Sequence, residues 1–262
     1  IGEFYKLPKS FSIISILLLI TSPALLLNAR IALLDTSVLV FTAWYIYFTA
    51  RLIKKPQKFL FIFLFISVLF AFLIKPNAIF GLPAVLTIIS WNIKERGFKK
   101  FHTHLGLTYV LAIIIPLSFY MIFSRQINEV TGSSLITNLD DLFYQIKQNV
   151  FLTFHWFRIY YFQYLIPFLT IPILYKSTKY TKLYLIMLIW IITVFVGMIT
   201  LNQFYFPRHT LMLVLPLIII AAGLASELPK KLGVILVSVM IFAKLDLDCK
   251  ITTSLENAPI AL

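Results

Sequence analysis

Residues 59–74 read Phe59-Leu-Phe-Ile-Phe-Leu-Phe-Ile-Ser-Val-Leu-Phe-Ala-Phe-Leu-Ile74, an unbroken apolar run interrupted by one hydroxyl. A lysine stands at either end, Lys58 and Lys75. A helix that is apolar on every face is either buried in a large core or spans a membrane. Spanning takes about 20 residues, with about 17 at the short end of the range. The stretch therefore predicts a membrane-spanning helix with a charge at each interface.

The rest of the chain repeats this pattern. The sequence has 262 residues, of which 60% are hydrophobic, and its mean hydropathy is +0.93. A soluble domain is only about 45–50% apolar, whereas lipid can solvate a much larger apolar surface. We expect an all-α, polytopic transmembrane bundle, a single transmembrane domain over 1–262 with about eight or nine spans of near-membrane length. The expected spans are 11–27, 36–51, 59–74, 78–92, 105–123, 159–175, 183–201, 209–226 and 232–245.

The net charge of +13 does not indicate a nucleic-acid partner, because the cations form short clusters between apolar runs and no continuous stripe. Lys and Arg concentrate in alternate connectors, as the positive-inside rule requires of a multi-pass protein of the cell membrane. The sequence contains a single cysteine, Cys249, so the chain cannot form an internal disulfide. We place the richer set of connectors in the cytoplasm: the N-terminal stretch, 51–58, 94–104, 176–182 and 227–231.

The long connector 124–158 is then extracytoplasmic, and part of it predicts a helix lying on the membrane. Its apolar residues recur every three or four positions, which is helical spacing, and Asn138 is placed to cap that helix. The aromatic-rich residues 151–162 that follow suit an interfacial belt. The apolar positions are Leu135, Leu139, Leu142, Phe143, Ile146 and Val150.

The outer connectors are short, yet each carries a cation next to the membrane boundary. Charged groups at this depth are costly and often functional, and a basic pocket between helices suits a phosphate-bearing lipid. Snorkelling toward the headgroups is the simpler alternative for any one of them. The candidate substrate-binding residues are Arg30, Lys75, Arg158 and Arg208, with His209 beside the last.

Asp35 opens the second expected span and is the candidate catalytic acid. It could pair with Arg30 or cap its helix. It could equally orient a sugar hydroxyl, accept a proton or hold a divalent metal ion, which leaves the cofactor open. His102 and His104 lie in a basic cytoplasmic connector, where we expect them to be solvated. No spacing indicates a dedicated metal site, a P-loop or a dinucleotide motif.

Three outer stretches resemble the GT-C family of membrane glycosyltransferases, which includes protein O-mannosyltransferases and lipid A aminoarabinose transferases. They are Thr21-Ser-Pro-Ala-Leu-Leu-Leu-Asn-Ala-Arg-Ile-Ala-Leu-Leu-Asp-Thr36, Phe70-Ala-Phe-Leu-Ile-Lys-Pro-Asn-Ala-Ile79 and Tyr205-Phe-Pro-Arg-His-Thr-Leu-Met-Leu-Val-Leu-Pro216. The resemblance extends over roughly residues 15–225. The chain departs from the family pattern at Ile74, where many members have Thr, and at His209, where many have Tyr.

The resemblance implies a polyprenyl-phosphate sugar donor and a lipid, glycan or protein acceptor outside the cytoplasm. It also implies that Arg30, Lys75 and Arg208 hold the donor phosphate, with Asp35 as an accessory acid. The family's principal catalytic acid lies in its first outer loop. The chain begins at Ile1 and not at Met, so we expect that loop to precede this sequence. A transporter or lipid flippase, or a non-catalytic membrane scaffold, are the alternatives.

Overall fold

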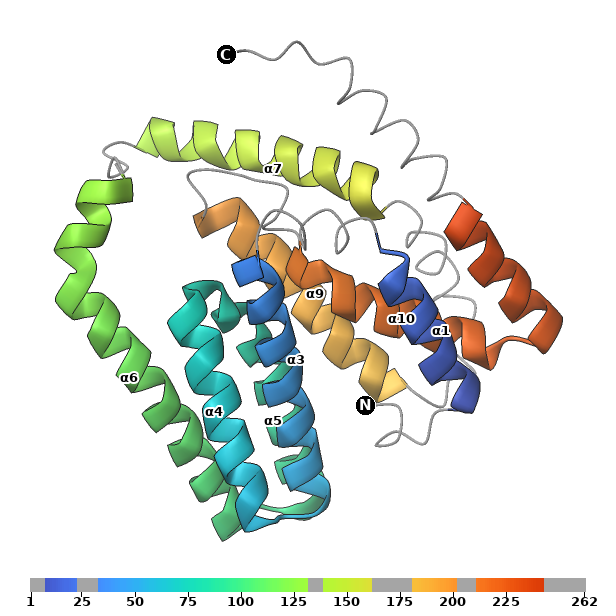
Figure 1. Ribbon diagram of the computed structural model, residues 1–262, viewed down its shortest axis with the longest axis horizontal. Coiled ribbons are helices and arrows are strands. Elements are labelled where there is room, and N and C mark those ends of the chain that lie inside the picture. The colour runs from blue at the N-terminus through green and yellow to red at the C-terminus, as the bar shows by residue number, and fades with distance from the viewer. Residues whose placement is uncertain (1–7, 23–32, 132–138, 162–180, 202–210, 243–262) are drawn as a thin grey trace.

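The computed structural model describes residues 8–22, 33–131, 139–161, 181–201 and 211–242, and these are helical apart from short turns. Figure 1 shows the helices as one bundle with a helix laid across one end. The helices are α1 (Lys9–Ile20), α3 (Leu33–Lys54), α4 (Lys58–Ile74), the 3-10 helix η1 (Pro76–Gly81), α5 (Leu82–Arg96), α6 (Lys100–Thr131), α7 (Leu139–Tyr161), α9 (Thr181–Leu201) and α10 (Val214–Glu227). Residues 230–242 form a further helix.

Four consecutive helices, α3 to α6, run up and down beside one another (Figure 1). On α4, one side packs inward through Leu64, Val68 and Ala71, which are fully buried. The opposite side exposes large apolar groups, such as Ile62 at 61% and Phe63 at 49%. An exposed face of this size is unfavourable in water and favourable against lipid. The all-α membrane bundle is thus confirmed.

Helix lengths follow the predicted spans with small shifts. Four helical segments are long and apolar enough to cross a membrane: Asp35–Lys54, Pro76–Arg96, Lys100–Ile122 and Thr181–Ile199. Three shorter apolar helices accompany them in the described ranges, Lys9–Ile20, Lys58–Ile74 and Leu211–Glu227. Most of the expected span 159–175 lies outside the described residues, so the total of eight or nine spans stays a prediction.

The two ends of the bundle differ in charge. The turn between α3 and α4 and the turn between α5 and α6 lie together at the lower end in Figure 1, and these are the connectors expected in the cytoplasm. An ion pair between Lys182 and Glu95 brings the start of α9 to the same end. The connector after α4, with Lys75, lies at the opposite end, which we call the outer end after its predicted orientation. This alternation is the one that the basic clusters predict, while the membrane orientation itself stays a prediction.

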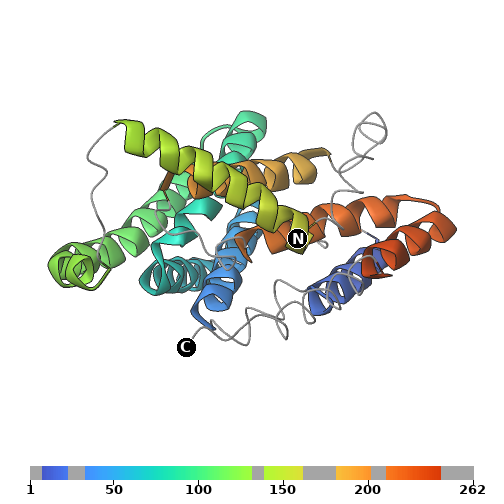
Figure 2. The same ribbon diagram turned by 90° about the horizontal axis from the view of Figure 1, so that it is seen from above.

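Helix α7 lies across the upper end of the bundle (Figures 1 and 2). A helix in this region was expected, and the predicted apolar positions Ile146 and Val150 are half-buried. Asn149 and Thr153 are the buried residues, at 3% and 1% exposed, whereas Phe143 is 68% exposed. Asn149 Nδ2 donates to the carbonyl of Ile199 on α9 at 3.2 Å. Hydrogen bonding to a neighbouring helix therefore acts together with the apolar periodicity in deciding which face turns inward.

His102 corrects another expectation, because it is 5% exposed and not solvated. Its Nδ1 accepts the N–H of Lys99 at 2.9 Å, and its Nε2 lies 3.0 Å from Asn92 Oδ1. The imidazole also packs against Phe101, with ring centroids 3.9 Å apart. The reason is local: the turn between α5 and α6 folds back and encloses the ring. His104 is exposed, as expected.

Candidate functional site at the outer end of the bundle

Lys75 lies between α4 and η1, in an extended conformation with φ −163° and ψ 134°. Pro76 follows it, and the residue before a proline is disfavoured in a helix. The helix therefore ends at Ile74, and its last turn is closed by the Lys75 N–H bonding to Ala71 O at 3.2 Å. A cation in this position is also favoured by the C-terminal end of the helix dipole. The Lys-Pro sequence thus ends α4 and places Lys75 in the connector that follows it.

Asp35 receives the Lys75 side chain. Lys75 Nζ lies 2.5 Å from Asp35 Oδ1, although the two residues are 40 positions apart. Asp35 stands in the first turn of α3, where the helix dipole favours an acid. The side chains are 10% and 26% exposed for Asp35 and Lys75, respectively. The pair is therefore largely shielded but still accessible from the outer end.

Two tyrosine hydroxyls anchor the backbone on either side of Lys75. Tyr45 on α3 is fully buried and donates to Ala78 O at 2.7 Å. Tyr120 on α6 donates to Leu73 O at 3.0 Å. The Leu73 carbonyl is one that the end of α4 leaves without an intrahelical partner, and the Ala78 carbonyl belongs to η1. The connector that carries Lys75 is consequently held by both neighbouring helices.

Close glycine contacts hold η1 against the bundle. A Cβ on Gly81 would overlap the ring and hydroxyl of Tyr45 and would approach Thr42 Cγ2 to 2.6 Å. A Cβ on Gly197 of α9 would overlap the ring of Phe80, which belongs to η1. Bare backbone at these two positions lets α3 and α9 approach η1 closely, as small residues do between membrane helices. Three helices therefore position the Lys75 connector.

Of the candidate residues chosen from sequence, the structure brings Asp35 and Lys75 into contact. Arg158 falls within α7, and Arg30, Arg208 and His209 lie outside the described residues. For Asp35, a pair with Arg30, a helix cap and a direct role were all left open; the described residues show a pair with Lys75, and the pairing with Arg30 stays a prediction. The Thr36 Oγ1 atom, one residue from Asp35, is buried with no hydrogen-bond partner in the described part of the chain. In those same residues no group of three or more His, Cys, Asp or Glu side chains forms a metal site.

Sequence reasoning missed the residues that support this pair, above all Tyr45, Tyr120 and Gly197. A signal was present, because a tyrosine inside an apolar helix needs a partner for its hydroxyl. What the sequence did not show was which carbonyl would accept the bond. Those partners are 33 and 47 residues away.

Residues 5–120 match the dolichyl-phosphate-mannose-protein mannosyltransferase family. The match contains α1, α3, α4, η1 and α5 and most of α6, and thus includes both Asp35 and Lys75. This part of the chain is thus similar to GT-C mannosyltransferases of the membrane. Comparisons with curated proteins and with solved structures gave no match. The family similarity supports a membrane glycosyltransferase in general terms.

Proposed function

We propose that the protein transfers a sugar from a polyprenyl-phosphate donor to a hydroxyl of a lipid, glycan or protein acceptor. The reaction takes place on the extracytoplasmic side of a cell membrane that the helices cross several times. The observation that carries the proposal is the shielded Lys75–Asp35 pair, 2.5 Å apart at the outer end and within the segment that matches the mannosyltransferase family.

The chemistry explains why a cation belongs there. In the transfer, the bond from the anomeric carbon to the phosphate oxygen breaks, and a bond to the acceptor oxygen forms. The acceptor proton goes to a base, and the negative charge accumulates on the departing polyprenyl phosphate. An ammonium group aimed at that oxygen stabilises the transition state more than the ground state. Lys75 fills this role in the proposal.

Asp35 has a supporting role toward Lys75 and a direct one toward substrate. Its carboxylate holds the ammonium in place, and its remaining lone pairs can accept a sugar hydroxyl or ligate a divalent metal ion. Arg30 and Arg208 complete the phosphate site in the proposal, because a guanidinium can bind phosphate through two hydrogen bonds. Arg158 and His209 are proposed as further contacts to the substrate.

The distribution of charge supports an enzyme over a transporter. Transporters place polar groups and broken helices near the middle of the bilayer. In helices α3 to α5, the charged residues stand near the helix ends, as Asp35 and Lys54 do on α3. A non-catalytic scaffold predicts that the outer cations are scattered around the perimeter, whereas Lys75 is turned toward Asp35.

The test is sugar transfer from a polyprenyl-phosphate donor by the full-length protein in liposomes. Lys75→Ala is expected to lower the rate about 10²–10³-fold, the usual loss for one electrostatic group in the transition state. Arg208→Ala is expected to act similarly. Arg208→Lys should recover part of the rate, since it keeps the charge but not the two-point contact. Lys55→Ala, in the connector at the other end, should leave transfer unchanged.

A second variant separates the chemistry from the fold. Lys75→Ala alone leaves a shielded carboxylate unpaired, which can destabilise the bundle. The double variant Asp35→Asn/Lys75→Gln removes both charges and keeps a hydrogen-bonded pair. We expect it to retain the thermal unfolding midpoint of the parent and to remain inactive. Parental activity in this double variant would show that the pair is structural and would refute the proposed role of Lys75.

A further inference from the structure

A second polar pocket lies at the opposite end of the bundle, between α3, α5 and α9. Its volume is about 180 Å³, and it is lined by Ile53, Ile88, Trp91, Asn92, Glu95, Lys182 and Ile186. The three isoleucines form an apolar floor and are each at most 7% exposed. The polar groups lie nearer the surface, since the Glu95 and Lys182 side chains are 48% exposed. The pocket therefore has a dry base and a charged rim.

The rim presents both signs of charge and an aromatic ring. Lys182 pairs with Glu95, and its Nζ also lies 4.9 Å from the centroid of the Trp91 ring. A half-exposed ion pair contributes little to stability, and its members exchange readily with other partners. Glu95 would repel a ligand that carries only a negative charge, and Lys182 would repel a ligand that carries only a positive charge. A ligand that carries both charges close together satisfies the whole rim.

The wall of the pocket adds an oriented donor. Asn92 is 8% exposed, and its Oδ1 is engaged by His102 Nε2 at 3.0 Å. His102 is held in turn by the backbone N–H of Lys99 at 2.9 Å. With the oxygen occupied, the Asn92 amide nitrogen is the end of the side chain that can donate to a ligand.

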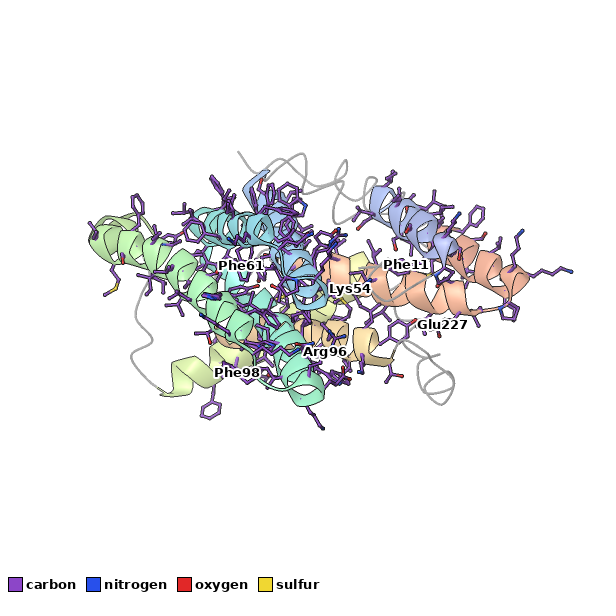
Figure 3. The ribbon with its side chains drawn as sticks, turned by 90° about the horizontal axis from the view of Figure 1, so that it is seen from below. Phe11, Lys54, Phe61, Arg96, Phe98 and Glu227 are labelled. Atoms are coloured by element: carbon purple, nitrogen blue, oxygen red, sulfur yellow. The ribbon has the colours of Figure 1, made fainter. Side chains whose placement is uncertain are left out.

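The pocket opens at a basic end of the bundle. Figure 3 shows this end from below, with Lys54 and Arg96 labelled beside it. Both residues are exposed, as is Lys94. Basic pockets between membrane helices attract phosphate headgroups, and tryptophan is favoured at the headgroup level. The occupant that this location supplies at high concentration is a membrane lipid.

We propose that this pocket binds the zwitterionic headgroup of a phosphoethanolamine lipid. The phosphate accepts hydrogen bonds from Lys182 Nζ and from the Asn92 amide. The primary ammonium donates to Glu95 and lies against the face of Trp91 as a cation–π contact. The site is separate from the Lys75–Asp35 pair and does not depend on the proposed sugar transfer.

The test compares two lipids of equal chain length on the full-length protein, dioleoyl-phosphatidylethanolamine and dioleoyl-phosphatidylglycerol. Retention of each lipid is measured by native mass spectrometry after titration in detergent. We expect the ethanolamine lipid to bind about tenfold more tightly, as one charge-assisted contact predicts. Equal binding of the two lipids, or tighter binding of the glycerol lipid, would overturn the proposal.

Variants make the expected result specific. Glu95→Gln should weaken binding of the ethanolamine lipid, because it removes the acceptor for the ammonium group. It should strengthen binding of the glycerol lipid, because it removes the repulsion of an anion. Lys182→Ala should weaken the binding of both lipids. The matched control is Lys58→Ala, exposed at the same end, which should change neither. A Glu95→Gln variant that leaves the ratio of the two affinities unchanged would contradict the assignment of the ammonium.

A water-soluble analogue distinguishes binding of a lipid from binding of a free metabolite. Glycerophosphoethanolamine has the same headgroup without acyl chains, and we expect it to bind far more weakly, since it buries none of the acyl surface. If it binds as tightly as the lipid, a soluble phosphoethanolamine ester is the occupant, and the lipid is not. Unaltered unfolding midpoints of all variants establish that the fold is intact.

Discussion

Lys75 and Asp35 show how two ordinary charged residues become a candidate site. Each is favoured locally by its helix end, Asp35 at the start of α3 and Lys75 at the end of α4. Their contact depends on the connector between α4 and η1, which Tyr45 holds from the neighbouring helix. At the residue scale, the uncharged hydroxyl of Tyr45 therefore helps to position the Lys75 ammonium group.

Tyr45→Phe tests this support. The change removes the buried hydrogen bond from Tyr45 to the Ala78 carbonyl and should lower the free energy of unfolding by about 1–3 kcal/mol. Transfer activity should fall as well, because the Lys75 connector loses an anchor. Tyr47→Phe is the control, since among the described residues the Tyr47 hydroxyl accepts a hydrogen bond from the exposed Arg51 side chain. Thermal unfolding in detergent measures the first effect, and an unchanged midpoint for Tyr45→Phe would argue against the anchor.

Between elements, the close approach of α9 and η1 decides how the bundle closes. Gly197 faces the Phe80 ring with no room for a Cβ, so two segments distant in sequence meet at bare backbone. The polar face of α7 provides a second example, because Asn149 docks on Ile199 of α9. Both contacts join α9 to the outer end, which also contains Lys75.

Gly197→Ala is expected to destabilise the bundle by about 1–3 kcal/mol, the usual cost of overpacking. Gly106→Ala is the matched change on α6, where a Cβ meets nothing within 4 Å. There the loss of glycine flexibility should leave stability equal or raise it by about 0.5–1 kcal/mol. Urea or thermal unfolding of the two variants side by side is the measurement. Equal stability of both would mean that Phe80 moves aside freely.

In the whole molecule, the connectors rich in basic residues lie at one end of the bundle. The connectors at 51–58 and 94–104 share one end, and the connector between α4 and η1 shares the other end with α7 (Figure 1). Such sorting is what the positive-inside rule predicts for a protein inserted in one orientation. It also separates the two proposed ligand sites, with the Lys75–Asp35 pair at one face and the headgroup pocket at the other.

Cysteine labelling tests the orientation. In a Cys249→Ser background, Lys55→Cys should resist an impermeant maleimide added to intact cells, and Lys147→Cys should react with it. Lys147 is exposed on α7, so access is not limited by packing. Both positions should react after the membrane is permeabilised. Labelling of position 55 from outside in intact cells would reverse the proposed topology and place the Lys75–Asp35 pair in the cytoplasm.

The sequence by itself determined the class of protein and the positions of most helices. Long apolar runs bounded by charges have few alternatives to membrane helices, because every backbone group in lipid must be bonded within its own segment. Helix ends were also readable, as at Lys75-Pro76, since proline acts on the residue directly before it. The choice of Asp35 and Lys75 as candidates came from the same local information.

Only the tertiary structure decided which groups meet. The pairing of Asp35 with Lys75, the enclosure of His102 and the polar inward face of α7 each depend on contacts between separate helices. In a membrane bundle nearly every helix face is apolar, so periodicity cannot tell a lipid-facing side from a packed one. Packing is then directed by small residues and a few hydrogen bonds, and those partners lie too far apart along the chain for the sequence to pair them.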